Sequence, residues 1–264
     1  MPFPNFDGKH AHDAMVNPED LLRWRIERGL IAQDVRVPEA VIVTYQPLLW
    51  EAAAGAEATS ECAASPTASL RTLDTTEGQV GVLGKFGFGA PIAAILIEEL
   101  ICLGVTRFLS IGAAGSLQQS LAVGEIVLCE AAVRDEGVSH HYLPPATHST
   151  PSPSLTAALE RELAAGRGLH FRRGSSWTVD APYRETVEEA RHYQAQGVDC
   201  VEMEAAAVFA VGEHRGVDVA AAVCISDLLG ELEWEPQFDS EDLVLGMWGL
   251  YQAARRCLIA TLEL

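Results

Sequence analysis

The sequence has few basic residues, and this shortage excludes several classes of protein. Its 264 residues include 18 Lys and Arg against 37 Asp and Glu, which gives a formal net charge of -19. A surface of this sign repels the phosphate backbone of nucleic acids and the anionic headgroups of membranes, so we expect neither partner. A small anionic ligand is still compatible with the composition, because one local basic pocket can override the overall field.

Further absences narrow the class and the compartment. No segment approaches the ~20 consecutive apolar residues of a membrane span. Residues 1–7 contain no basic stretch followed by an apolar run, so we expect no signal peptide. The six cysteines form no Cys-x-x-Cys pair and have no histidine at zinc-ligand spacing. This pattern favours buried thiols in a reducing cytoplasm and no metal site.

Apolar strand-like runs alternate with helix-like segments along most of the chain. The alternation predicts an α/β fold with a buried, largely parallel sheet. No internal repeat or linker is visible, so we expect one domain over residues 1–264, with residues 1–35 as a polar, irregular extension. The expected strands are residues 40–45, 79–84, 107–111, 125–129 and 219–225; the expected helices are residues 19–28, 91–103, 155–165, 185–196, 204–215 and one from about residue 241, while residues 52–69 fit a helix followed by a surface loop.

A glycine-rich turn, Gly87-Phe88-Gly89, lies between an expected strand and an expected helix. Glycine lacks a Cβ, so the backbone there can approach a phosphate or a ring closely. The turn is not a dinucleotide-binding fingerprint, because the third glycine is missing and Leu109 and Ser110 stand where a ribose-binding acid is required. A tight strand-to-helix turn without a ligand explains the pattern equally well.

Three carboxylates are candidates for chemistry, two at the start of an expected helix and one at the end of an expected strand. Glu202 and Glu204 flank Met203 in an apolar neighbourhood, and two buried carboxylates need donors such as the hydroxyls of a ribose. A solvated helix start, where acids favour the helix dipole, is the alternative, and composition alone favours it. Asp227 follows the apolar residues 220–225, where a desolvated carboxyl can protonate a leaving group. Capping of the following turn is an equal alternative.

Taken in order, these segments resemble the nucleoside phosphorylase and nucleosidase family, of the purine nucleoside and uridine phosphorylase type. The resemblance covers roughly residues 80–230. It implies a single three-layer α/β/α domain with a mixed central sheet, assembled as a dimer or a trimer of dimers. It also implies a small-molecule nucleoside as ligand and no cofactor, with phosphate as a possible co-substrate. The segments that carry it are residues 87–91, 98–104, 111–115, 123–127, 133–137, 201–205 and 225–227.

The resemblance implies roles for the residues that would bind the ribose. Glu204 would hold the ribose hydroxyls, with Met203 against the sugar and Glu202 in support. In many members a histidine near the N-terminus reaches the ribose 5′-hydroxyl in a neighbouring subunit, and His10 or His12 would do so here.

The resemblance also implies which residues surround the base and which kind of base is bound. Asp227 matches the acid that hydrogen-bonds or protonates a purine at N7 as the base departs. Uridine-specific members generally lack this acid, and the Gln and Arg that recognise uracil are not matched near Tyr183 and Glu185. We therefore expect a purine nucleoside. The positions expected around the base are Gly115, Trp177, Val179 and Tyr183.

The acceptor region, which we define as Gly87, Ser110 and Ala113, departs from the family. Phosphorolytic members carry an arginine where Ser110 stands, a hydroxyl where Ala113 stands, and a Gly-Asp-Pro-x-Arg loop where residues 45–49 read Tyr-Gln-Pro-Leu-Leu. Each charged arginine–phosphate hydrogen bond contributes roughly 1.5–3 kcal/mol. Losing two or three of them should therefore weaken the binding of phosphate by several orders of magnitude. Lys85 is one possible basic substitute, and Arg134 is another.

We therefore predict an enzyme that cleaves the N-glycosidic bond of a nucleoside, with phosphate or water as the acceptor. Hydrolytic relatives activate water with a carboxylate near the N-terminal loop, and Glu51 is the acid near that place. A nucleoside-binding protein without catalysis is the alternative of another class. A dinucleotide-dependent oxidoreductase is disfavoured by the missing ribose-binding acid.

Overall fold

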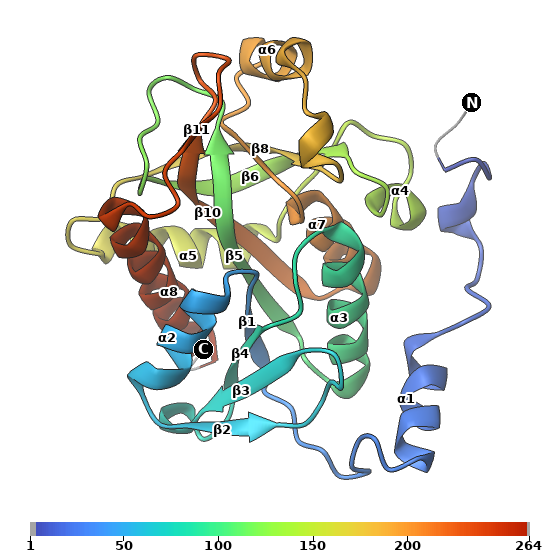
Figure 1. Ribbon diagram of the computed structural model, residues 1–264. Helices are drawn as coiled ribbons and strands as arrows, with labels where there is room; N and C mark the ends of the chain where they lie inside the picture. Colours follow the sequence, from blue (N-terminus) through green and yellow to red (C-terminus); the bar gives the residue numbers. More distant parts are fainter. Residues whose placement is uncertain (1–3, 263–264) are drawn as a thin grey trace.

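The computed structural model describes residues 4–262 (Figure 1). The strands are β1 (Ala40–Thr44), β2 (Thr59–Cys62), β3 (Ser69–Leu73), β4 (Val80–Gly84), β5 (Arg107–Ser116), β6 (Ile126–Asp135), β7 (His148–Ser149), β8 (Phe171–Val179), β9 (Cys200–Glu202), β10 (Asp218–Leu228) and β11 (Glu235–Pro236). The helices are α1 (Pro18–Glu27), α2 (Pro47–Ala56), α3 (Ala90–Leu103), α4 (Ser139–Tyr142), α5 (Pro153–Ala165), α6 (Val187–Ala195), α7 (Ala205–Arg215) and α8 (Glu241–Leu262), with 3-10 turns η1 (Lys9–Ala11), η2 (Asp74–Thr76) and η3 (Pro182–Arg184).

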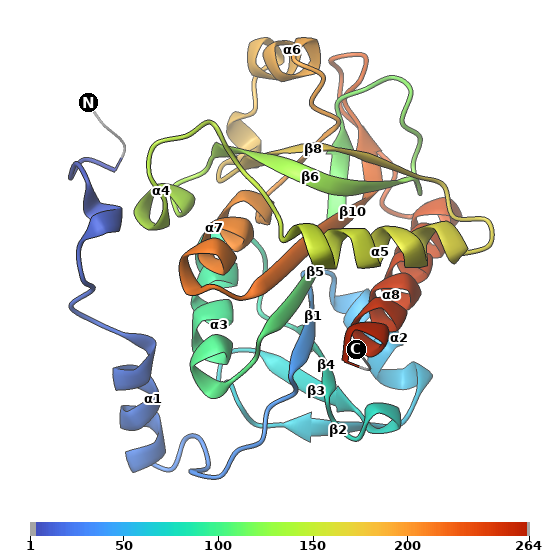
Figure 2. The same ribbon diagram turned by 180° about the vertical axis from the view of Figure 1, so that it is seen from behind.

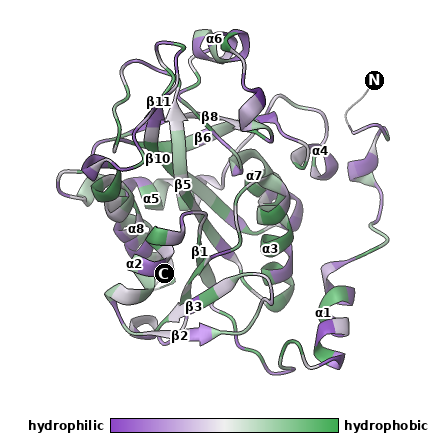
Figure 3. Ribbon diagram, in the orientation of Figure 1, coloured by the Kyte–Doolittle hydropathy of each residue, from purple (hydrophilic) through white to green (hydrophobic). Residues whose placement is uncertain are grey.

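Helices cover both faces of the sheet. The two ribbon views place α3 and α7 on one face and α2, α5 and α8 on the other (Figures 1 and 2). Strand β1 shows why the sequence folds this way, because its residues alternate between two cores. Val41 and Val43 belong to the core under α3 and α7, while Ala40 and Ile42 belong to the core under α2 and α8. Hydrophobic residues follow these central strands, and many outer loops are hydrophilic (Figure 3).

The sheet closes partly on itself, and this closure builds the site. Its strand order is β11-β10-β6-β8-β9-β5-β1-β4-β3-β2, with β7 beside β6 and a further pairing of β10 with β5. Strands β5, β10, β6, β8 and β9 therefore form a ring. The pairs β1–β4, β1–β5 and β5–β10 are parallel, whereas β5–β9, β6–β10 and the β2–β3 hairpin are antiparallel. The mixed sheet is confirmed, and since β6–β8 and β8–β9 are parallel too, the expectation of a largely parallel sheet is correct in part.

The expected helices are present, but the sequence pattern missed several strands. The expected surface loop within residues 52–69 contains β2, which pairs with β3. Strand β8 was not expected, because the polar run from Arg172 to Ser176 hides its alternation. Strand β5 continues through the glycine- and alanine-rich residues 112–115, which have low strand propensity. Likewise, Asp227 lies inside β10 and not after its end.

Candidate active site

Glu202 is the last residue of β9, and donors surround its buried carboxylate. One oxygen accepts from the hydroxyls of Ser176 (3.1 Å) and Thr178 (2.5 Å). The other accepts the backbone N–H groups of Glu204 and Ala205, each at 2.7 Å. Burial raises the pKa of Glu202, and these donors oppose the rise. Glu202 therefore fixes the start of α7 and holds the next acid in place.

Glu204 directly precedes α7 and is 6% exposed. Its carboxylate accepts the backbone N–H of Gly89 at 2.5 Å. Burial and then the charge of Glu202 raise the pKa of Glu204 to about 8. Met203, between the two acids, is half-buried.

The glycine-rich turn has a specific contact in the site. Gly89, which supplies the N–H to Glu204, has φ +106°, and Gly87 has φ +91°. These values favour glycine over any residue with a side chain. A Cβ at Gly87 would meet nothing within 4 Å, so the constraint there is backbone conformation and not space. The turn therefore connects the end of β4 to the Glu202–Glu204 pair.

Gly115 joins the two acidic parts of the site. On β5 it is in register with Val201 of β9 on one side and with Asp227 of β10 on the other. A register shift between Ile225 and Asp227 interrupts the pairing of β10 with β5 just before this point. A Cβ at residue 115 would lie 2.9 Å from an Asp227 carboxylate oxygen and 2.4 Å from a methyl carbon of Leu229. Glycine at residue 115 therefore lets Leu229 and the Asp227 carboxylate pack against β5, between the strand that carries Glu202 and the strand that carries Asp227.

Asp227 is half-buried and held by two donors. One carboxylate oxygen accepts from the Ser226 hydroxyl (2.7 Å) and the other from the Trp234 indole N–H (2.9 Å). Glu185, at the end of η3, is a second carboxyl near it. Burial, then the charges of Asp227 and Glu189, raise the pKa of Glu185 to about 7. No motif in the sequence indicated a role for Glu185.

Tyr45 lies beside Ser110 in the acceptor region, and the sequence did not predict this position for Tyr45. It directly follows β1, is 8% exposed, and its phenolic oxygen is 2.9 Å from the hydroxyl of Ser110. Its ring packs edge-on to Phe86, with centroids 5.6 Å apart. A Cβ at Gly112 would lie 3.3 Å from a ring carbon of Tyr45. Ala113, further along β5, is half-buried and offers no hydroxyl. An aromatic side chain therefore stands against the serine that replaces the family's arginine.

The two proposed basic substitutes have other partners. The Lys85 ammonium is 3.1 Å from the Glu51 carboxylate and 4.5 Å from the centre of the Trp50 ring. The Glu51 carboxylate, the acid nearest the N-terminal loop, is thus paired with this lysine. The Arg134 guanidinium is buried and donates to the Ser139 hydroxyl (2.9 Å) and to two backbone carbonyl groups. Both cations are therefore held by contacts outside the acceptor region.

The residues expected around the base differ widely in exposure. Trp177 has no exposed surface, and its indole N–H donates to Asp135 at 2.8 Å. Val179 is 8% exposed, while Tyr183 is 98% exposed on η3. Trp177 packs in a core cluster with Val179 and Val201, and its expected place at the base stays a prediction. Direct contacts of Val179 and Tyr183 with a base stay a prediction.

Turn η1, which contains His10 and is followed directly by His12, contacts α4 of the same chain. His10 lines a cavity of about 180 Å³ with His140 and other residues of both segments. His12 is exposed and packs edge-on to Phe6. Lys9 ties the segment to α4 through a 2.8 Å contact with His141. The expected reach of His10 or His12 into a neighbouring subunit stays a prediction.

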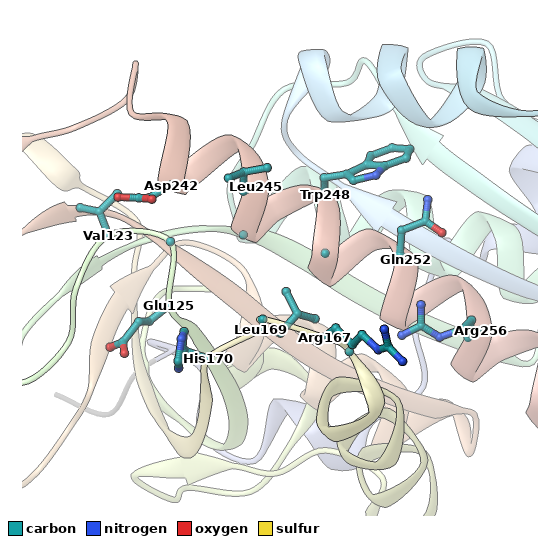
Figure 4. A pocket seen from close by; sticks show the side chains of 15 residues that line it. Val123, Glu125, Arg167, Leu169, His170, Asp242, Leu245, Trp248, Gln252 and Arg256 are labelled. Carbon is teal, nitrogen blue, oxygen red and sulfur yellow. The ribbon is translucent and has the colours of Figure 1, made fainter.

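A larger cavity, of about 490 Å³, lies elsewhere in the molecule (Figure 4). It is bounded by α8 and by the loops before β6 and β8, with Arg167, His170 and Trp248 on its walls. None of the residues predicted for the site lines it. Among residues 4–262, no group of three or more His, Cys, Asp or Glu side chains could hold a metal ion. Across the same residues, no helix combines the length and the apolar character needed to cross a membrane.

The chain belongs to the phosphorylase superfamily, whose family model matches residues 40–246. Among its relatives, the guanosine phosphorylase of Halorubrum lacusprofundi is 34% identical over 142 residues, which are 53% of this chain and 58% of that protein. The DeoD-type purine nucleoside phosphorylase of Bacillus cytotoxicus is 29% identical over 152 residues, or 56% of this chain and 63% of that protein. The match thus spans about three-fifths of the length of these relatives.

Solved structures confirm the expected fold. The purine nucleoside phosphorylase of Toxoplasma gondii, in complex with immucillin-H, matches with a TM-score of 0.75 and 22% identity, over 86% of this chain and 92% of that one. The uridine phosphorylase of Vibrio fischeri matches with a TM-score of 0.73 and 24% identity, over 87% and 94%. At these identities the likeness establishes the fold alone.

Proposed function

We propose that the protein is an enzyme that cleaves the N-glycosidic bond of a purine nucleoside. The observation that carries the proposal is the register of Gly115 with Val201 on one side and with Asp227 on the other. This register places the buried pair Glu202 and Glu204 and the acid Asp227 on either side of one side-chain-free position. A ribose held at Glu204 would direct its base toward Asp227, with the glycosidic bond between the two acidic parts.

The proposed chemistry follows from the Glu202–Glu204 pair on one side and Asp227 on the other. The ribose 2′- and 3′-hydroxyls would donate to Glu204, whose carboxylate Glu202 and Gly89 hold in position. As the bond to the base breaks, positive charge develops on the sugar, and nearby carboxylates stabilise it. Asp227 would hydrogen-bond or protonate the purine at N7 and so stabilise the leaving group. The names of the two relatives, guanosine phosphorylase and purine nucleoside phosphorylase, support a purine.

We also infer a single domain over residues 1–264 and a homo-oligomer, either a dimer or a trimer of dimers. His10 or His12 would then act on the ribose in a neighbouring subunit. A cytoplasmic location is supported by six free cysteines, five of them buried. The acidic composition supports the absence of nucleic acid and membrane partners.

The test is base release from inosine, guanosine, adenosine and uridine, followed by chromatography with and without phosphate. We expect purine release under at least one condition and little release from uridine. Nucleoside binding in calorimetry without release under any condition would replace the enzyme with a binding protein. Faster release from uridine than from the purine nucleosides would contradict the purine assignment.

A further inference from the structure

The acceptor side of the site is enclosed by neutral and apolar groups. Tyr45 lies against Gly112, and its phenolic oxygen is bonded to Ser110. Phe86 packs on the outer edge of its ring. Burial and then the charge of Glu204 raise the pKa of Tyr45 well above its usual value, so the phenol is neutral. The acceptor side of the site therefore presents the aromatic ring of Tyr45 and the hydroxyl groups of Tyr45 and Ser110.

An anion entering this space would meet unfavourable charges. The carboxyls of Glu202 and Glu204 are both buried beside it, and the two influence the phenol of Tyr45 electrostatically. Phosphate carries one to two negative charges near neutral pH, and its binding sites in proteins supply arginine, lysine or several backbone N–H groups. Gly89, at the nearby turn, already donates its N–H to Glu204.

Lys85, directly after β4, is turned to the other core. The ammonium of Lys85 lies over Trp50, whose side chain belongs to the core under α2 and α8, and is paired with Glu51. Tyr45 belongs to the opposite core, under α3 and α7. Bringing Lys85 to the acceptor region would break its ion pair and its contact with the ring. The described contacts therefore leave the acceptor side without a counter-charge.

Building on the proposed function, we propose that Tyr45 closes the acceptor side to phosphate, so that the attacking group is water. The hydrogen bond between Tyr45 and Ser110 uses one hydroxyl hydrogen, and the other is left to orient a water molecule. The water oxygen bonds to C1′ as the C1′–N9 bond breaks, and the electron pair of that bond leaves with the purine. The proton that water loses is taken up by the purine, assisted by Asp227. The products are free ribose and free base, so no further reactant is needed.

Product analysis is the first test. Wild-type protein is given guanosine or inosine in buffers with and without inorganic phosphate at matched ionic strength. The expected result is base release at the same rate in both buffers, with free pentose as the sugar product. Release that requires phosphate and yields a pentose 1-phosphate would overturn this inference while leaving N-glycosidic cleavage intact.

Phosphate binding is the second test, and it does not depend on turnover. Inorganic phosphate is titrated into the protein by calorimetry, with and without an unreactive purine nucleoside analogue. We expect no saturable binding by the wild type. The double variant Tyr45→Gly/Ser110→Arg, which removes the ring and adds a guanidinium, should gain saturable binding, whereas Ala63→Arg on the exposed β2–β3 loop should not. Saturable binding by the wild type overturns the inference, whether or not the double variant folds.

A conservative variant separates the ring from its hydroxyl. Tyr45→Phe keeps the ring and should still bind no phosphate. It should lower kcat by about tenfold or more with little change in KM, because it removes a group that orients water. If no nucleoside is cleaved under any condition, the proposed function fails, and the wild-type phosphate titration still decides whether the acceptor side is closed.

Discussion

The backbone N–H of Gly89 is bonded to the carboxylate of Glu204, 115 residues further along the chain. This bond links the turn after β4 to the start of α7. It also requires Gly89 to adopt φ +106°. The position of Glu204, the proposed ribose-binding acid, therefore depends on a backbone conformation that only glycine adopts without strain.

Gly89→Ala should therefore impair both folding and nucleoside binding. The strained backbone should cost about 1–3 kcal/mol of unfolding free energy, and displacement of Glu204 should raise KM. Gly104→Ala is the matched control, because Gly104 has φ +113° and open space around it at the end of α3. The control should lose stability in thermal unfolding and keep its KM. A similar rise in KM for both variants would contradict the role given to Gly89.

Glu204→Ala should lower kcat/KM for inosine by up to about a hundredfold, since it removes the hydrogen bonds to both ribose hydroxyls, worth roughly 0.5–1.5 kcal/mol each. The substrate 2′,3′-dideoxyinosine lacks the hydroxyls that Glu204 would bind. Wild type and variant should therefore cleave it equally slowly. A variant that still loses a hundredfold on the dideoxy substrate would show that Glu204 acts on something other than these hydroxyls.

The raised pKa of Glu204 predicts how stability changes with pH. The folded protein favours the protonated carboxyl, so this contribution is fully present below the unfolded value of 4.5 and is lost as pH rises through about 8. Glu204→Gln stays neutral, and its melting temperature relative to wild type should rise across that range. Glu61→Gln, on an exposed glutamate, should show no such trend. A constant difference between Glu204→Gln and wild type would contradict the assigned pKa.

Asp227→Asn should slow cleavage of guanosine by about 10²–10⁴-fold, the usual contribution of a general acid. The substrate 7-methylguanosine already carries a positive charge on its base and needs no protonation at N7. The variant should therefore cleave it at nearly the wild-type rate. An equal loss on both substrates would assign Asp227 a structural role in place of leaving-group stabilisation.

Glu185 should set the alkaline limb of the pH profile. Its pKa, raised to about 7 by burial and by Asp227, keeps it protonated below that pH. Above that pH, a second negative charge beside Asp227 should disfavour the departing base, so kcat/KM for guanosine should fall. Glu185→Gln should remove this limb in steady-state profiles. An unchanged profile would show that Glu185 does not act on the reaction.

The sequence predicts much of the fold because its apolar runs are continuous where strands are buried on both faces, as in β1. It fails where strands are polar on one face, as in β8, or rich in glycine, as at the end of β5. The closure of the ring through the pairing of β5 with β10 leaves no local signal. It depends on strand curvature and on contacts between distant segments.

Glu202, Glu204 and Asp227 were proposed as site residues from a resemblance in the order of their segments, and the structure places their strands on either side of Gly115. In the sequence, Tyr45 was noted only as one of the residues that stand in place of the family's Gly-Asp-Pro-x-Arg loop. Its position against Ser110 requires the parallel pairing of β1 with β5, which places the two strand ends side by side. Glu185 carries no signal, because its surroundings come from distant segments.

The most direct test of the site is a crystal structure with an unreactive purine nucleoside analogue. The account predicts ribose hydroxyls within hydrogen-bond distance of Glu204, purine N7 beside Asp227, and the glycosidic bond near Gly115. An analogue bound elsewhere, for example in the cavity beside Trp248 on α8, would contradict it (Figure 4).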